Sequence, residues 1–180
     1  TELETVKLCP SIKVLDQTFT NCEKLSSVNL QNVETIGEWT FLNTALTSLD
    51  LSNVKSLGRY AFESCHKLTK VKLGAECEVG VRVFFMCSNL VAVDLGGANL
   101  DKASSCFKRC TSLKMIKYDG HKLPEGIFGD CKSLKSVMLG SNVDSIMWSA
   151  FEGCTGLDTL YCESPAPPTL PTGQTFTIDS

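Results

Sequence analysis

The feature that most constrains the fold of this chain is a leucine that recurs every 21 to 23 residues from one end to the other. A chain that repeats at a fixed short period cannot bury the apolar side of one unit alone, so neighbouring units must stack. The series consists of Leu3, Leu25, Leu46, Leu68, Leu90, Leu113, Leu134 and Leu157. We therefore expect a coil that advances by one turn per repeat.

Each of these leucines begins the pattern L-x-x-L-x-L, in which apolar residues follow at the third and fifth positions. The third-position residues are Val6, Val28, Leu49, Val71, Val93, Ile116, Val137 and Leu160, and the fifth-position residues are Leu8, Leu30, Leu51, Leu73, Leu95, Tyr118, Leu139 and Cys162. An apolar pair at a spacing of two predicts a short strand with alternate side chains inward. A period of 20 to 29 residues that carries this pattern is typical of a leucine-rich repeat.

A phenylalanine column occupies the other half of each repeat, and a cysteine follows three residues later in six of its seven members. The column contains Phe19, Phe41, Phe62, Phe84, Phe107, Phe128 and Phe151, and the cysteines are Cys22, Cys65, Cys87, Cys110, Cys131 and Cys154. Thr44 replaces the cysteine in one repeat. In the same repeat the segment from Phe41 to Leu46 is one residue shorter than in the others, so its return loop should be tighter. An apolar pair such as Val33 with Ile36 predicts a second extended segment on the opposite wall.

These patterns together predict a repeat solenoid that is rich in β structure and belongs to the α/β class by convention. We expect a right-handed leucine-rich-repeat coil of about seven to eight repeats of 21 to 23 residues, with one strand per repeat in a parallel sheet. The repeats fill residues 1 to 164, and the proline-rich residues 165 to 180 form an exit segment. Its alternating residues 175 to 178 are a candidate capping strand. The first strand lacks a preceding Phe-Cys half-repeat, so we expect that the array starts in mid-repeat and that an upstream segment is missing.

The ten cysteines invite a disulfide, metal or thiol hypothesis, but most of them occupy core positions of the repeat. Six share one column, where a thiol fits as a small apolar side chain and weak donor, and stacked neighbours have parallel Cβ vectors that do not suit a disulfide. Cys106 and Cys162 replace apolar core residues. For Cys9 and Cys77, partial exposure, reactivity and disulfide pairing all stay open.

Composition and motifs argue against several functional classes. The net charge of −3 and the acidic isoelectric point give no reason to expect nucleic acid or an anionic membrane as partner. The most apolar stretch, residues 81 to 93, is too short to cross a bilayer, so no transmembrane segment is predicted. The chain has no clustered metal-ligand motif and no phosphate-binding loop, so no metal or cofactor is expected.

No catalytic residue is predicted either. A thiol nucleophile needs a histidine base, and the two histidines are better interpreted as a solvated surface residue, His66, and a structural one, His121. Asp50 and Asp94 are two coils apart, and charges that alternate along a strand face are usually only solvated.

The repeat closely resembles the BspA-like leucine-rich repeats. The strings I-G-x-x-x-F and A-F-x-x-C-x-x-L-x-x-V-x-L are present in residues 57 to 73, with Leu57 in the first position, and the resemblance covers residues 1 to about 164. It implies a surface or secreted protein of a host-associated bacterium or mucosal protist that is associated with adhesion to host proteins or other microbes. Residues 76 to 81 and 98 to 105 depart from the second-wall pattern, so curvature is not expected to be uniform.

If the chain binds a ligand, the outward residues of the strand face are the first candidates, because packing fixes the inward ones. The candidate binding face comprises Lys7, Asn29, Asp50, Lys72, Asp94, Met115, Lys117, Met138 and Tyr161. Its C-terminal third gathers methionine and tyrosine, which are favoured at recognition surfaces. Unconstrained variation is the simpler explanation of the same residues.

Three functions follow from this sequence. The first is a non-catalytic cell-surface or secreted binding module for a host or microbial protein or glycan. The alternative is a structural spacer within a larger surface protein. The third, a thiol-dependent redox or hydrolytic protein, requires an exposed cysteine of low pKa.

Overall fold

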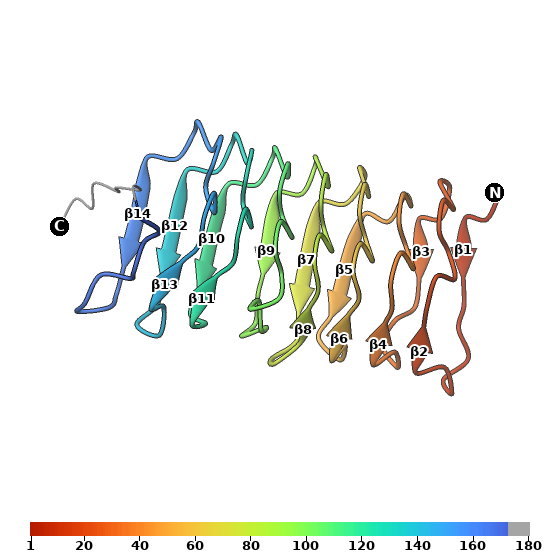
Figure 1. Ribbon diagram of the computed structural model, residues 1–180. Helices are drawn as coiled ribbons and strands as arrows, with labels where there is room; N and C mark the ends of the chain where they lie inside the picture. The colour runs from red at the N-terminus through yellow and green to blue at the C-terminus, as the bar shows by residue number, and fades with distance from the viewer. Residues whose placement is uncertain (173–180) are drawn as a thin grey trace.

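Residues 1–172 are described by a computed structural model, in which the chain winds as a solenoid of about seven turns. Figure 1 shows the strands of successive turns side by side from the N-terminal to the C-terminal end. All of the regular elements in this part of the chain are short β-strands, and none is a helix. The repeat solenoid expected from the leucine period is thus confirmed.

The front wall consists of the L-x-x-L-x-L segments. Its strands are β1 (Thr5–Val6), β3 (Ser27–Val28), β5 (Ser48–Leu51), β7 (Lys70–Leu73), β9 (Ala92–Asp94), β10 (Met115–Tyr118), β12 (Ser136–Leu139) and β14 (Thr159–Cys162). In β5, β7 and β10 exposed and buried residues alternate, with the third- and fifth-position apolar residues inward. Every pairing between these strands is parallel.

The front wall is divided into three sheets, β1-β3, β5-β7-β9 and β10-β12-β14. Both interruptions coincide with a change in repeat length. The return loop before β5 is the short one that contains Thr44, and the segment from Leu95 to Phe107 is two residues longer than the segment from Tyr118 to Phe128. Because each coil must hydrogen-bond to the next in register, such a change shifts one strand relative to its neighbour.

The second wall contains the extended segments predicted opposite the front wall. Here β2 (Val14–Leu15), β4 (Thr35–Ile36), β6 (Ser56–Leu57) and β8 (Glu78–Val79) form one sheet, and β11 (Lys122–Leu123) pairs with β13 (Ser145–Ile146) in another. The degenerate residues 76 to 81 therefore still supply a strand, whereas Asn99 makes only a single bridge to Glu78. Thr169 bridges to Ser145, so the exit segment adds a last rung, and the expected capping strand at residues 175 to 178 lies outside the described residues.

The glycine of the I-G motif permits close contact between coils on this wall. A Cβ atom added at Gly58 would lie 2.6 Å from the backbone nitrogen of Glu38 and the carbonyl carbon of Gly37. No side chain fits at that distance, which explains why the motif requires glycine.

The third wall carries the phenylalanine column, whose rings stack face to face with centroids 5.2 to 5.8 Å apart. The residues two before and two after each phenylalanine have φ between 47° and 71°. They are Gln17, Trp39, Tyr60, Arg82, Ser105, Gly126 and Ser149 before it, and Asn21, Asn43, Ser64, Met86, Arg109, Asp130 and Gly153 after it. In the coils of Phe19 to Phe128, the amides at these positions and at the phenylalanines donate to the next coil, as Phe41 does to the Ala61 carbonyl at 2.8 Å.

The cysteine column joins neighbouring coils through its thiols. The Cys87 Sγ donates to the Phe62 carbonyl and the Cys110 Sγ to the Phe84 carbonyl, each at 3.2 Å. Thr44 occupies the same position, but its hydroxyl donates to the Phe41 carbonyl of its own coil at 3.1 Å and contacts the next coil through the Cys65 Sγ at 3.3 Å. The column is therefore a set of small buried donors that satisfy main-chain carbonyls.

All ten cysteines are free thiols. Cys106 is buried as expected, and burial raises its pKa to about 12. Cys77, whose exposure the sequence leaves open, is also completely buried, and burial raises its pKa to about 11. Cys9 is exposed, and Cys162 is only half-buried at the C-terminal edge of the array.

Candidate functional site

The register of the front wall places the outward column of the strands in lines along the solenoid. Asp50 pairs with Lys72 and Lys72 with Asp94 across β5, β7 and β9. Lys117 pairs with Met138 and Met138 with Tyr161 across β10, β12 and β14. Lys7 is exposed beside the end of β1. The strand face is thus interrupted twice, between β3 and β5 and between β9 and β10. The outward residues before the second interruption are called the N-terminal set, and those after it the C-terminal set.

The N-terminal set is polar and partly committed to the fold. The amide of Asn29 spans the gap to the first coil, where its Oδ1 accepts from the Leu8 backbone N–H at 2.6 Å and its Nδ2 donates to the Leu8 carbonyl at 3.2 Å. Asp50 accepts from the backbone N–H of Ser52 at 3.1 Å, and hydrogen bonds from Ser52 lower the pKa of Asp50. Asn29 and Asp50 are therefore better explained as turn residues than as ligand contacts.

Lys72 separates the two carboxylates that an acid pair would need. The pairing order places Lys72 between Asp50 and Asp94, and Asp94 accepts from the Gly96 N–H at 3.1 Å. This arrangement does not hold two carboxyl groups together for proton transfer.

The C-terminal set presents larger side chains. Met115 and Tyr161 are 55% and 53% exposed, and Met138 is half-buried between Lys117 and Tyr161. Because the backbones of β10, β12 and β14 are paired with one another, these side chains project from a rigid sheet. Met115, Lys117, Met138 and Tyr161 are called the C-terminal patch below.

Hollows lie at both interruptions of the strand face. One of about 300 Å³ between β3 and β5 is lined in part by Asn29 and Asp50. Another of about 250 Å³ between β9 and β10 is lined in part by Asp94 and Lys117. The strand face is therefore uneven at the places where the repeat length changes.

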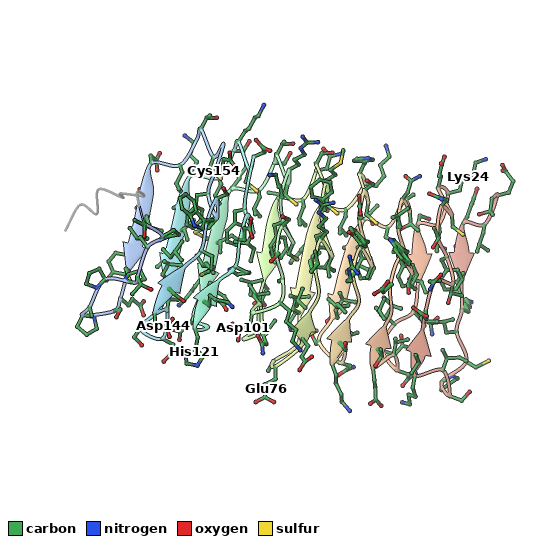
Figure 2. The ribbon with its side chains drawn as sticks, in the orientation of Figure 1. Lys24, Glu76, Asp101, His121, Asp144 and Cys154 are labelled. Atoms are coloured by element: carbon green, nitrogen blue, oxygen red, sulfur yellow. The ribbon has the colours of Figure 1, made fainter. Side chains whose placement is uncertain are left out.

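A third hollow, of about 440 Å³, lies at the turn edge, where the front wall bends towards the second wall. Figure 2 shows Glu76, Asp101 and His121 along this edge, with Asp144 further along, on the opposite side from Cys154 and Lys24. The ring of Tyr118 forms part of the hollow, its hydroxyl donates to the Lys122 carbonyl at 3.2 Å, and burial raises its pKa to about 12. Tyr118 is larger than the leucine that most other coils have at this position, and it lies in the coil whose turn, from Tyr118 to Phe128, is the shortest.

Neither histidine lies in an arrangement suited to catalysis. His66 Nδ1 is 3.3 Å from the hydroxyl of Ser88, and His121 Nδ1 is 4.0 Å from a carboxylate oxygen of Asp144 at an exposed position. Within residues 1–172, no three histidine, cysteine or acidic side chains converge as a metal site would require. No helix long and apolar enough to span a membrane occurs in the same residues.

A second exposed surface escapes sequence reasoning. Trp39 and Tyr60 stack on one another outside the third wall, and Arg82 lies beyond Tyr60 on the next coil. All three stand two residues before a column phenylalanine, and the three arginines of the chain fall in three successive repeats. A tabulation of the residues at every repeat position, exposed as well as buried, would have shown that these aromatic and arginine side chains occur in neighbouring repeats.

Comparison with known proteins shows to which family this chain belongs. The description "BspA type Leucine rich repeat region" matches six copies over residues 1–114 and 77–166. This chain is a BspA-type leucine-rich repeat protein. The resemblance inferred from the I-G and A-F-x-x-C strings is confirmed. None of the curated proteins matches this BspA-type chain significantly.

Among solved structures, a leucine-rich repeat protein shows the same fold. A leucine-rich repeat protein from Bacteroides ovatus has a TM-score of 0.65 and 20% identity, with 88% of this chain aligned to 49% of that one. A leucine-rich cell surface protein from Faecalibacterium prausnitzii has a TM-score of 0.47 and 21% identity, over 89% of this chain and 60% of that one. This chain thus spans about half the length of the Bacteroides protein.

Proposed function

We propose that this BspA-type chain is a non-catalytic binding module, displayed on a cell surface or secreted, that adheres to a host or microbial macromolecule through its strand face. The observation that carries the proposal is the C-terminal patch, in which Lys117, Met138 and Tyr161 are aligned across three strands. Met115 and Tyr161 of this patch are each more than half exposed. Such side chains on a rigid sheet lose little conformational freedom when a partner covers them.

A protein or glycoprotein fits this patch best. Tyrosine and methionine supply apolar contact area with a polar end, and Lys117 adds one charge at the centre. Interfaces concentrate their binding energy in a few such residues, so removal of the patch should abolish most of the affinity.

The test is capture by an immobilised panel of purified extracellular-matrix proteins, mucosal glycoproteins and bacterial cells. Wild type is compared with the variant Met115→Ser, Met138→Ser, Tyr161→Ser, and with a control, Val91→Ser and Met147→Ser, that removes exposed apolar side chains elsewhere. We expect the patch variant to bind its partner at least about ten-fold more weakly. Equal capture by all three proteins would overturn the proposal.

The spacer function rests on the linear stacking of the coils, which separates the first coil from the last (Figure 1). A spacer needs no ligand, so a complete lack of capture by the panel favours it. The thiol-dependent function gains no support from Cys87 and Cys110, because these two thiols are hydrogen-bonded to carbonyls and burial holds their pKa well above the ordinary value.

A further inference from the structure

Charged side chains of opposite sign are gathered at the two edges of the front wall, in the coils that contain β7, β9, β10 and β12. The return edge precedes these strands and comprises residues 63–69, 85–91, 108–114 and 129–135. The turn edge follows the same strands and comprises residues 74–78, 96–102, 119–122 and 140–144. Figure 2 shows Glu76, Asp101 and Asp144 on the turn side, opposite the return loops marked by Cys154 and Lys24.

The return edge is basic. It carries six lysine and arginine side chains against two carboxylates. The cations are Lys67, Lys108, Arg109, Lys114, Lys132 and Lys135, and the carboxylates are Glu63 and Asp130. Arg109 Nε lies 3.7 Å from Asp130 Oδ2, and within residues 1–172 the other five cations have no ion pair within 4.0 Å. This edge therefore presents positive charge that the chain itself leaves largely uncompensated.

The turn edge is acidic. Its five carboxylates are all exposed and outnumber two lysines. The carboxylates are Glu76, Glu78, Asp101, Asp119 and Asp144, and the lysines are Lys102 and Lys122. Lys102 lies 3.6 Å from Glu78, and His121 lies 4.0 Å from Asp144. In the part of the chain that the structure describes, the other three carboxylates have no ion pair. The overall charge of −3 thus conceals two edges of opposite sign.

Both edges are hollowed in the coils of β7, β9 and β10. The hollow of the return edge measures about 380 Å³, and His66, Arg109 and Lys132 contribute to its lining. The hollow of the turn edge measures about 440 Å³, and Glu76 and Asp101 contribute to its lining. Because the same strands connect the two edges, the basic hollow and the acidic hollow lie at the same level along the solenoid axis.

We infer that this chain associates laterally with further copies of itself, with the basic return edge of one copy against the acidic turn edge of the next. The two edges have the same spacing along the axis, because the same coils form both. Successive phenylalanine rings of these coils are 5.5 to 5.7 Å apart. A copy that is displaced along its front-wall strands therefore meets its neighbour coil by coil, a match that an unrelated acidic partner has no reason to provide.

A contact between two different edges does not close on itself, so the association can continue from copy to copy. Displacement without rotation keeps the strand faces of all copies on one side. The C-terminal patch is then repeated once per copy, and a partner with several binding sites is held more tightly than by one copy. The inference thus goes beyond the proposed binding function, and self-association itself requires no partner.

The association should be reversible and sensitive to salt. Exposed charge pairs are individually weak, and the screening length falls from about 30 Å at 0.01 M salt to about 3 Å at 1 M. Contacts among many such charges should therefore hold copies together at low salt and release them at high salt. A strong association that is indifferent to salt would contradict this electrostatic origin.

The experiment is sedimentation velocity of the whole chain over a series of concentrations, at about 0.01 M and about 1 M salt. We expect the average mass to rise with concentration at low salt, and the self-association to be at least about ten-fold weaker at high salt. A chain that stays monomeric at every concentration in low salt would overturn the inference. Retention of that monomer on immobilised dextran sulfate would show that another polyanion occupies the return edge instead.

Two charge-reversal variants test whether the contact joins different edges. Arg109→Glu with Lys132→Glu removes the excess positive charge of the return edge and leaves the turn edge intact. Glu76→Lys with Asp101→Lys reverses the turn edge and leaves the return edge intact. Each variant alone should be monomeric, whereas an equimolar mixture should form a dimer and nothing larger, because each partner keeps one functional edge. A mixture that stays monomeric would contradict the pairing of these two edges.

The control is Lys7→Glu with Lys72→Glu, which changes the net charge as much as the return-edge variant does but lies on the strand face. It should self-associate as wild type does, and an equal loss in the control would show that net charge alone is responsible. Thermal unfolding checks that every variant is folded. If wild type is monomeric but the panel partner is still captured through the C-terminal patch, this inference is wrong and the proposed function stands.

Discussion

The stacked phenylalanine column gives a prediction whose magnitude can be worked from the structure. Phe84 is completely buried, and its ring stacks on Phe62 and Phe107 at 5.5 Å each. Burial of such a side chain stabilises the fold by about 3 kcal/mol. Each aromatic contact adds roughly 0.5 to 1.5 kcal/mol. Phe84→Ala should therefore reduce the free energy of unfolding by about 4 to 6 kcal/mol, at or above the upper end for such substitutions.

The matched comparison is Phe19→Ala. Phe19 is only half-buried at the N-terminal end of the column and stacks on Phe41 alone, at 5.3 Å. Half of the burial and one contact predict a loss of about 2 kcal/mol. Because Phe84→Ala removes much of a typical domain's stability, Phe84→Leu serves as the variant that keeps most of the apolar volume, with an expected loss of about 2 kcal/mol.

Guanidinium-induced unfolding, followed by the fluorescence of the two tryptophans, measures these differences. The essential result is the ranking, with the central Phe84→Ala well below Phe19→Ala. Equal losses at the two positions would refute the argument that stability arises from contacts between successive coils.

Three further predictions concern the cysteine column, pH and the glycine motif. Cys110→Thr should be more stable than its near-isostere Cys110→Val by about 1 kcal/mol in denaturant unfolding, because a hydroxyl can donate to a main-chain carbonyl of this wall, either that of Phe84, which accepts from the Cys110 thiol, or that of its own coil, as in Thr44. The reverse order would show that the thiol acts through size alone. The raised pKa values of Cys77, about 11, and Cys106, about 12, mean that the unfolded chain loses these protons first. Stability conferred by each neutral thiol is complete below the ordinary pKa of 9.0 and falls above it, by about 1.4 kcal/mol per pH unit per thiol, until the folded pKa is reached. The free energy of unfolding, measured from pH 7 to 11, should thus be constant at first and then decline, and the decline should be shallower in Cys106→Ala. An unchanged slope in that variant would contradict the assignment of a raised pKa to Cys106. Gly58→Ala should destabilise the protein by about 3 kcal/mol, because its Cβ would meet backbone 2.6 Å away; a thermal midpoint equal to that of wild type would mean that the coils separate easily.

The inward columns were predictable because stacking imposes the same requirement on every coil. Leu68, Phe62 and Cys65 recur at fixed positions, and the structure places all three completely inside. The outward strand column was predictable for the same reason, since the alternation along a strand fixes which residues face solvent. Its register across β5, β7 and β9 follows directly from the repeat.

The irregular features were harder to foresee because they depend on contacts between particular coils. The repeat lengths showed that Tyr118 begins a short turn, but only the structure shows that its hydroxyl donates to the Lys122 carbonyl. Asn29 was assigned to the binding face from its position, whereas its amide is occupied by the backbone of Leu8. The exposed stack of Trp39 and Tyr60, with Arg82 beyond it, was missed because these residues lie outside every apolar column on which the repeat was recognised.

The central claim is that inward residues hold the fold while outward strand residues bind the partner. The most direct test is a scan of single substitutions at every position from 1 to 172, sorted once for protease resistance and once for capture of the panel partner. The account predicts that substitutions at Phe107 and Leu134 lose resistance, while those at Met115, Met138 and Tyr161 keep resistance and lose capture. Capture that persists across the entire C-terminal patch, and declines only together with resistance, would contradict it.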